Sequence, residues 1–223
     1  MNDWKRIEAA SLQAPPPLLT AEDYCYFARE YHKWKDYTAG QGNDLIKNFK
    51  IKPSVANYEK RKFWKLQAVA QFATELAAFL PKHAVVAHIP TSKRPDHVDF
   101  DPRFDLLFEQ LKALRPDLRF EKPWDMNESH TAVHEGGNRS QEEFYAKLEW
   151  RGMAAHDGWI FLVDDVITDG CHFKACQQLL RENGFPHVAG VFWGVSVNPP
   201  VAKIEFNIDQ FLKNLPKTDT EKE

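Results

Sequence analysis

One stretch, residues 159 to 172, constrains the fold of this chain more than any other. It opens with an unbroken apolar run, Trp159 to Val163, which is typical of a strand buried on both faces inside a parallel sheet. Two acids and a short Thr-Asp-Gly turn follow. Cys171 to Asn183 then has the pattern of a helix that Gly184 ends. The order strand, tight turn, helix predicts an α/β domain.

The turn after this strand is predicted to bind a phosphate. In open parallel sheets, ligands bind beyond the carboxyl ends of the strands, and the N-terminus of a helix attracts anions. Side chains alternate across a strand, so Asp164 and Asp165 should point to opposite faces if the strand continues through them. We therefore expect one acid to meet the ligand and the other to hold backbone N–H groups or Thr168. Alternatively, the paired acids only cap the loop.

The residues Val163 to Gly170, VDDVITDG, resemble the phosphoribosyl-pyrophosphate motif of type I phosphoribosyltransferases, most closely the competence-protein F type. The resemblance implies that Asp164 and Asp165 bind the ribose hydroxyls. It also implies that the 5′-phosphate is wrapped by the turn residues Thr168, Asp169, Gly170, Cys171 and His172. The cofactor that it implies is Mg²⁺, carried with phosphoribosyl pyrophosphate.

A second buried strand, Ala84 to Ile89, precedes a basic turn. Its order resembles the pyrophosphate loop of the same family, which makes Thr91, Ser92, Lys93 and Arg94 candidate substrate-binding residues. Lys and Arg side chains suit a dense anion such as pyrophosphate. An ordinary basic turn is the structural alternative.

The polar stretch from Asn127 to Arg139 is predicted to be a loop. By resemblance it is the mobile loop that closes over the substrate, with Arg139 as a catalytic candidate. His130 and His134 lack a third ligand at metal spacing, so we expect no protein-bound metal.

Two positions depart from the family's pattern, because Asp169 and His172 stand where most members carry Thr, Ser or a small residue. If Asp169 caps the helix, its carboxylate takes the N–H donors that a phosphate needs. The sequence thus leaves two functions open: a phosphoribosyltransferase acting on a nitrogenous base, or a catalytically silent protein of that fold that binds a nucleotide or sugar phosphate as a regulator or effector. The acid pair argues against a third option, a redox or flavin-binding domain.

Composition narrows the class of protein. The chain has 223 residues, 43% of them apolar, which suits one domain. A net charge of -3 argues against general binding of nucleic acid or of membrane surfaces. No signal-like segment or membrane-length apolar run is present, and three cysteines suit a reducing compartment, so we expect a cytoplasmic protein. Cysteine thiols are expected to be buried rather than nucleophilic. The oligomeric state is open, a homodimer included.

The remaining pattern predicts a doubly wound, mainly parallel sheet with a small helical N-terminal hood. We expect the lead-in and hood over about 1–57, the α/β core over about 58–214 and a disordered tail over 215–223, within one domain. The predicted helices are 20 to 34, 58 to 80, 104 to 114 and a helix capped by Ser140 that runs to Trp150. The predicted strands include 118 to 120 and 187 to 195, whose Phe192 and Trp193 suit either a base pocket or the core.

Overall fold

A six-stranded sheet forms the centre of the computed structural model, which describes residues 4–8, 12, 15–35, 40–128 and 140–197. The strand order is β1-β2-β8-β7-β3-β4; β1 and β2 are antiparallel and the other neighbours are parallel. These strands are β1 (Lys5–Arg6), β2 (Tyr24–Tyr31), β3 (Val85–His88), β4 (Arg119–Phe120), β7 (Ile160–Ile167) and β8 (Val188–Ser196). A separate antiparallel pair consists of β5 (Trp124–Met126) and β6 (Leu148–Trp150).

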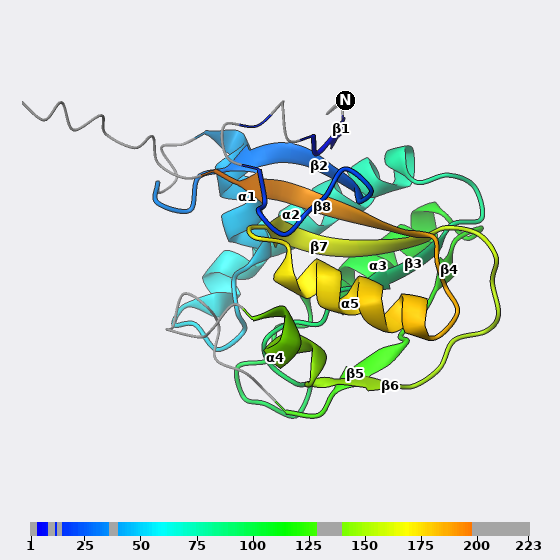
Figure 1. The fold of residues 1–223 in the computed structure, drawn as a ribbon. Coiled ribbons are helices and arrows are strands. Elements are labelled where there is room, and N and C mark those ends of the chain that lie inside the picture. The colour runs from blue at the N-terminus through cyan, green and yellow to red at the C-terminus, as the bar shows by residue number, and fades with distance from the viewer. Residues whose placement is uncertain (1–3, 9–11, 13–14, 36–39, 129–139, 198–223) are drawn as a thin grey trace, which may run out of the picture.

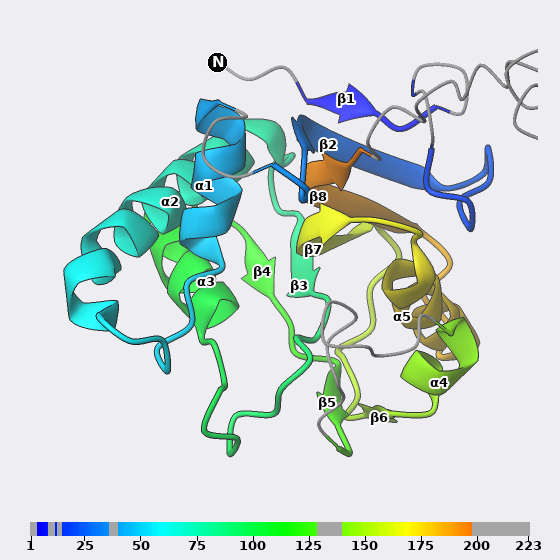
Figure 2. The same ribbon diagram turned by 90° about the vertical axis from the view of Figure 1, so that its left-hand side faces the viewer.

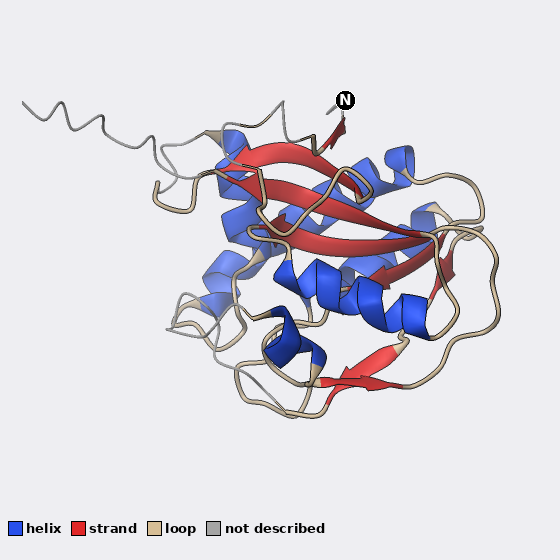
Figure 3. Ribbon diagram, viewed as in Figure 1, coloured by secondary structure: helices blue, strands red, loops and turns tan. Residues whose placement is uncertain are grey.

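Helices cover both faces of the sheet (Figures 1 and 3). One face carries α1 (Gln41–Phe49), α2 (Tyr58–Phe79) and α3 (Arg103–Leu114), and the other carries α5 (Cys171–Glu182) with the short α4 (Gln141–Tyr145) beside it (Figure 2). This arrangement is the doubly wound α/β class that the sequence predicts. In the described part of the chain, no helix is both long enough and apolar enough to cross a membrane.

The strand β7 lies in the middle of the sheet, between β8 and β3, and runs parallel to both. Its side chains alternate between two buried clusters: Leu162 packs in the cluster that contains α5, and Val163 packs in the cluster that contains α2. The predicted central strand is therefore confirmed. It also extends further than its apolar run, because both acids belong to the strand.

The helix predicted over residues 20 to 34 is wrong, because residues 24 to 31 form the strand β2. Cys25 and Phe27 are buried while Tyr24 is exposed, which is the two-residue period of a strand. Pairing with β8 along its length outweighs the helical spacing of its aromatic residues, and aromatic side chains favour strands. Thr20 does not cap a helix; its backbone N–H and hydroxyl donate to Asp23.

The helical part of the N-terminal region is α1, which packs on α2. Farther along, α2 and α3 lie close to their predicted bounds, although Leu114 at the end of α3 is exposed rather than buried. The Ser140 cap is confirmed, since its side chain accepts from the backbone N–H of Glu143. The predicted extension to Trp150 is wrong, because α4 ends at Tyr145 and the chain then pairs with β5 as β6.

Candidate active site

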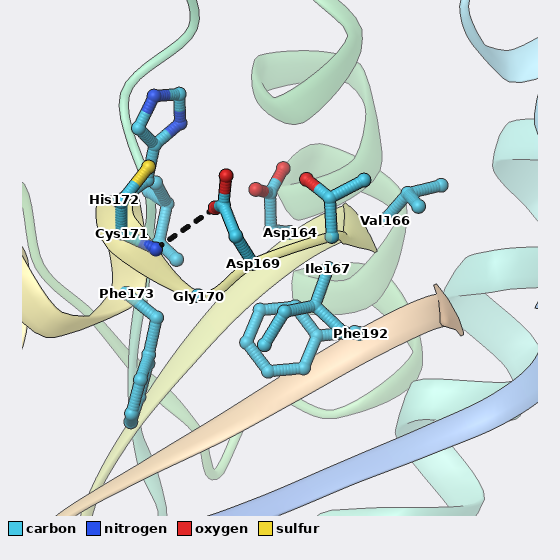
Figure 4. A pocket seen from close by; sticks show the side chains of 11 residues that line it. Asp164, Val166, Ile167, Asp169, Gly170, Cys171, His172, Phe173 and Phe192 are labelled. Carbon is cyan, nitrogen blue, oxygen red and sulfur yellow. Dashed lines mark hydrogen bonds between the residues drawn. The ribbon is translucent and has the colours of Figure 1, made fainter. Parts of the chain in front are cut away.

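A cavity of about 40 Å³, here called the turn cavity, lies where β7 ends and α5 begins (Figure 4). It is lined by Asp164 and by all the residues of the predicted phosphate turn, 168 to 172. Ile89, just after β3, and Phe192 of β8 complete one side. Residues from three neighbouring strands thus meet at the carboxyl edge of the sheet, the usual ligand position in α/β folds.

The two aromatic residues of β8 point to opposite faces of the sheet. Phe192 lines the turn cavity and is also buried in the core cluster that contains α5, so the structure leaves both of its predicted roles open. Trp193 is fully buried on the other face, where its ring stacks on Phe72 at a centroid distance of 4.5 Å. Trp193 therefore belongs to the core and has no contact with the site.

The turn itself depends on Gly170, whose φ of 91° lies in the left-handed region that glycine adopts most easily. A Cβ at this position would approach Leu19 Cδ2 to 3.1 Å. The neighbouring Leu18 donates its N–H to the carbonyl of Asp169 over 3.1 Å. The N-terminal lead-in thus packs against the turn and stabilises it through Leu18 and Leu19.

The carboxylate of Asp169 accepts a hydrogen bond from the backbone N–H of Cys171, with a distance of 3.1 Å (Figure 4). The helix begins after Gly170, so Asp169 caps it from one residue outside. The expected competition is present: an acid of the protein uses one of the helix amides that a phosphate would need.

His172 lies at the start of α5, where its ring stacks on Phe144 of α4 with centroids 3.9 Å apart and planes inclined by 19°. This contact joins α4 to the first turn of α5. The residue therefore serves packing as well as lining the turn cavity.

Asp165 faces the other side of the sheet and is enclosed by cations. Lys50 Nζ lies 2.8 Å from its Oδ1, and Arg103 Nη2 lies 2.7 Å from its Oδ2. Its side chain is only 5% exposed. The prediction that the two acids face opposite ways is confirmed, but Asp165 binds basic side chains rather than backbone amides or Thr168.

The ion pairs continue away from Asp165 through the interior. Arg103 Nη1 also lies 3.0 Å from Asp101 Oδ2, and the fully buried Lys65 donates to Asp101 Oδ1 over 2.7 Å. The two remaining Lys65 donors reach the carbonyls of Phe49 and Ile51. Three cations and two carboxylates therefore form one network with an excess of one positive charge, buried except at Lys50, whose side chain is 37% exposed.

The acid pair has divergent pKa values. Burial, and then the charge of Asp165, raise the pKa of Asp164 to about 7. Burial alone would also raise the pKa of Asp165, but Lys50 and Arg103 outweigh it and hold that pKa below its ordinary value. Near neutral pH the site thus holds one permanent carboxylate and one that exchanges a proton.

The predicted pyrophosphate residues lie around a second cavity of about 100 Å³, here called the loop cavity. Thr91, Lys93 and Arg94 line it, whereas Ser92 lines neither cavity. Arg94 is directed elsewhere, with Nη1 2.7 Å from the carbonyl of Asn127. The structure therefore places these residues beside the turn cavity rather than in it.

Some predicted features lie outside the described residues, namely Arg139 with His130 and His134, and the tail over 215–223. Within the described ranges, no three His, Cys, Asp or Glu side chains are grouped to hold a metal ion. The three cysteines are buried thiols, and burial raises the pKa of Cys25 and Cys176. These two thiols are poor nucleophiles at neutral pH.

Sequence reasoning missed the cations that bind Asp165. A signal for the buried network was present at Lys65, which precedes Val69, Phe72 and Leu76 at the four- and three-residue spacing of a buried helix face. The pairing of Arg103 with Asp165 joins residues far apart in the chain, and no local pattern marks it.

No known family profile and no curated protein sequence matches this chain. Two solved structures of a hypoxanthine phosphoribosyltransferase from Staphylococcus aureus, in orthorhombic and tetragonal crystals, are similar to part of it. Both show 11% identity and a TM-score of 0.35. They cover 60% and 59% of this chain, and 75% and 74% of their own. A similarity this low does not carry an activity from one protein to another.

Proposed function

We propose that this protein is a phosphoribosyltransferase, which transfers ribose 5-phosphate from phosphoribosyl pyrophosphate to a nitrogenous base or catalyses the reverse reaction. One observation carries the proposal: Asp164 and the turn 168 to 172 line a single cavity at the carboxyl edge of the central parallel strand. A carboxylate can accept from sugar hydroxyls, and a helix N-terminus attracts the phosphate on the same sugar.

In this mechanism the two acids have different roles. Asp164 accepts from the ribose hydroxyls, because it is the acid that lines the turn cavity. Asp165 positions the strand end through Lys50 and Arg103 and has no contact with ribose. The excess positive charge of the buried network stabilises anions bound nearby. Catalysis then consists mainly of positioning and of stabilising charge.

The leaving pyrophosphate is assigned to Lys93 and Arg94, which follow β3 as Ile89 does at the rim of the turn cavity. Mg²⁺ would arrive on the pyrophosphate oxygens, as is usual for this hard cation. Arg139 is assigned to the loop that closes over the substrate. We place the reaction in the cytoplasm, where buried thiols stay reduced.

Release of pyrophosphate from labelled phosphoribosyl pyrophosphate, with Mg²⁺ and a panel of purine and pyrimidine bases, tests the proposal. We expect Asp164→Asn to lower turnover by about 100-fold, the order seen when one group that stabilises the transition state is removed. The control is Glu109→Gln, which changes an exposed acid of α3 that lines neither cavity and should leave turnover unchanged. Wild-type protein that releases no pyrophosphate with any base would exclude the transferase.

The second candidate is a protein that binds a nucleotide or sugar phosphate without turnover. The hydrogen bond from Cys171 to Asp169 favours it, because the acid repels a phosphate from the same amide. Calorimetric titration with phosphoribosyl pyrophosphate separates the two. Binding that Asp164→Asn weakens, without turnover, supports the silent protein, whereas neither binding nor turnover rejects both.

A further inference from the structure

Most of the surface inside the loop cavity is apolar, although seven of the residues that line it are charged. The cavity lies between the chain after β3, the start of α3 and the strand β5. Phe100, Phe104, Trp124 and Met126 contribute to its lining. An enclosed apolar cavity of about 150 Å³ holds one benzene molecule. The loop cavity is smaller, at about 100 Å³, but partly open, so a single ring fits if part of the ligand extends beyond the cavity.

His88 offers this cavity a hydrogen-bond acceptor. Its Nδ1 lies 3.0 Å from the carbonyl of Ile89, and a carbonyl only accepts, so Nδ1 carries the proton. Burial lowers the pKa of His88, so the ring is neutral at neutral pH. Its Nε2 then holds a lone pair, and it has no hydrogen-bond partner among the described residues. The ring is held in place by stacking on Phe104, with planes inclined by only 1°.

Lys93 is the cation in the lining that forms no direct ion pair with a described residue, although the charge of Asp99 is close enough to interact with it. The carboxylates around the cavity are already neutralised by ion pairs: Asp101 with Lys65 and Arg103, Asp105 with Lys122, Glu121 with Arg119, and Asp125 with Arg151. Across the ranges that the structure describes, no carboxylate lies within the 4.0 Å ion-pair distance of Lys93. An anionic ligand group would give Lys93 a direct ion pair.

We propose that the loop cavity binds a small planar aromatic acid. The ring lies against Phe104 and Trp124, its carboxylate pairs with Lys93, and an N–H or O–H donor on the ring reaches His88. Each element matches one feature of the cavity: apolar surface, one cation without a direct ion pair and one neutral acceptor. This site shares Lys93 with the position proposed for pyrophosphate, but it goes beyond the proposed transferase activity, because it requires neither Asp164 nor the turn cavity.

Calorimetric titration of the full chain with four compounds tests the proposal: 3-hydroxybenzoate, 4-hydroxybenzoate, benzoate and phenol. We expect one hydroxybenzoate to bind about tenfold more tightly than benzoate, which lacks the donor, and than phenol, which lacks the acid. Lys93→Met should weaken that hydroxybenzoate about tenfold and leave phenol unchanged. His88→Phe, which keeps an aromatic ring beside Phe104, should lower its affinity to the level of benzoate.

The control is Lys112→Met, which removes an exposed lysine from the far end of α3 and should change none of the affinities. Equal binding of benzoate, phenol and both hydroxybenzoates to the wild-type chain would overturn the proposal, as would no binding at millimolar concentration. The comparison of the four compounds uses only the wild-type chain, so it tests the proposal even if the His88→Phe variant does not fold. Pyrophosphate release is measured separately, so failure of this site leaves the transferase proposal untouched.

Discussion

Arg103, at the start of α3, reaches Asp165 in the central strand, where its Nη2 lies 2.7 Å from the Oδ2 of the acid. The pair joins a helix on one face of the sheet to the strand that carries the candidate site. Arg103 is 14% exposed and Asp165 5%, so water screens the pair little. The end of β7 is therefore held from the side opposite to the turn cavity.

Replacing Asp165 should destabilise the fold. Asp165→Asn leaves Lys50 and Arg103 facing a neutral amide, and removing one partner of a buried pair costs about 3 to 5 kcal/mol. Urea unfolding measures the free energy of unfolding. The control is Asp105→Asn, whose partner Lys122 is 69% exposed and whose loss should cost less than about 1 kcal/mol. Equal effects of the two changes would contradict the role of Asp165.

Replacing Lys65 should lower the free energy of unfolding about as much as replacing Asp165, although lysine is usually a surface residue. Lys65→Met removes all three donors to Asp101, Phe49 and Ile51, and we expect a loss of about 3 kcal/mol. Lys62→Met, at an exposed position of the same helix, is the control and should change stability by less than about 0.5 kcal/mol. A thermal unfolding series compares the two. Similar melting temperatures for both variants would contradict the buried network.

Asp164 should make stability depend on pH. Its pKa is raised to about 7 in the folded protein from about 3.9 in an unfolded chain. The folded state therefore binds the proton more tightly than the unfolded chain does. The stability that this proton contributes is fully present below about pH 4 and is lost as the pH rises through about 7. We expect Asp164→Asn to be more stable than wild type at pH 8, by roughly 4 kcal/mol at about 1.4 kcal/mol per pKa unit, and nearly equal at pH 4. Urea unfolding of both proteins at a series of pH values checks this prediction. An equal difference in stability at pH 4 and at pH 8 would refute it.

Asp169 should limit the affinity of the turn for anions. Asp169→Asn removes the charge and keeps an acceptor for the Cys171 amide, whereas Asp169→Gly removes both. We expect about tenfold tighter binding of inorganic phosphate in the first variant, and tighter still in the second. Phosphorus NMR titration gives the affinities, with Glu109→Gln on the exposed face of α3 as the control. Unchanged affinity in both variants would mean that Asp169 does not compete with phosphate.

Alanine substitutions at two glycines test how closely the N-terminal lead-in packs on the turn before α5. Gly170 and Gly184 have nearly equal φ, 91° and 88°, so alanine should strain the backbone equally, by about 1 kcal/mol. Only at Gly170 would the new Cβ also approach Leu19, to 3.1 Å. We expect Gly170→Ala to lower the free energy of unfolding by about 1 kcal/mol more than Gly184→Ala. Equal losses in urea unfolding would indicate that Leu19 moves aside.

The central unit of the fold was predictable because its signals are local. The apolar run at 160 to 163 has to be buried on both faces, and the glycine after Asp169 permits the tight turn into α5. Those features predicted the strand, the turn and the edge of the sheet at which the turn cavity lies. The opposite orientation of Asp164 and Asp165 also followed, because alternation along a strand is a property of the backbone.

The segment from Tyr24 to Tyr31 shows where local signals fail. Its aromatic residues fit a helical period, yet the segment is a strand because β8 supplies a neighbour of matching length. Which segment pairs with which is decided by the packing of the whole chain. The same limit hid Lys50 and Arg103, whose partner Asp165 is more than 60 residues away in sequence.

The sequence by itself determined the class of fold, the central strand and the turn that marks the candidate site, because backbone geometry and burial of apolar runs act over short stretches. Only the tertiary structure decided which acid lines the turn cavity, which cations neutralise the other, and that Thr91, Lys93 and Arg94 line a separate cavity. Charge pairing and cavity shape depend on distances in space, and these are fixed only when distant segments pack together.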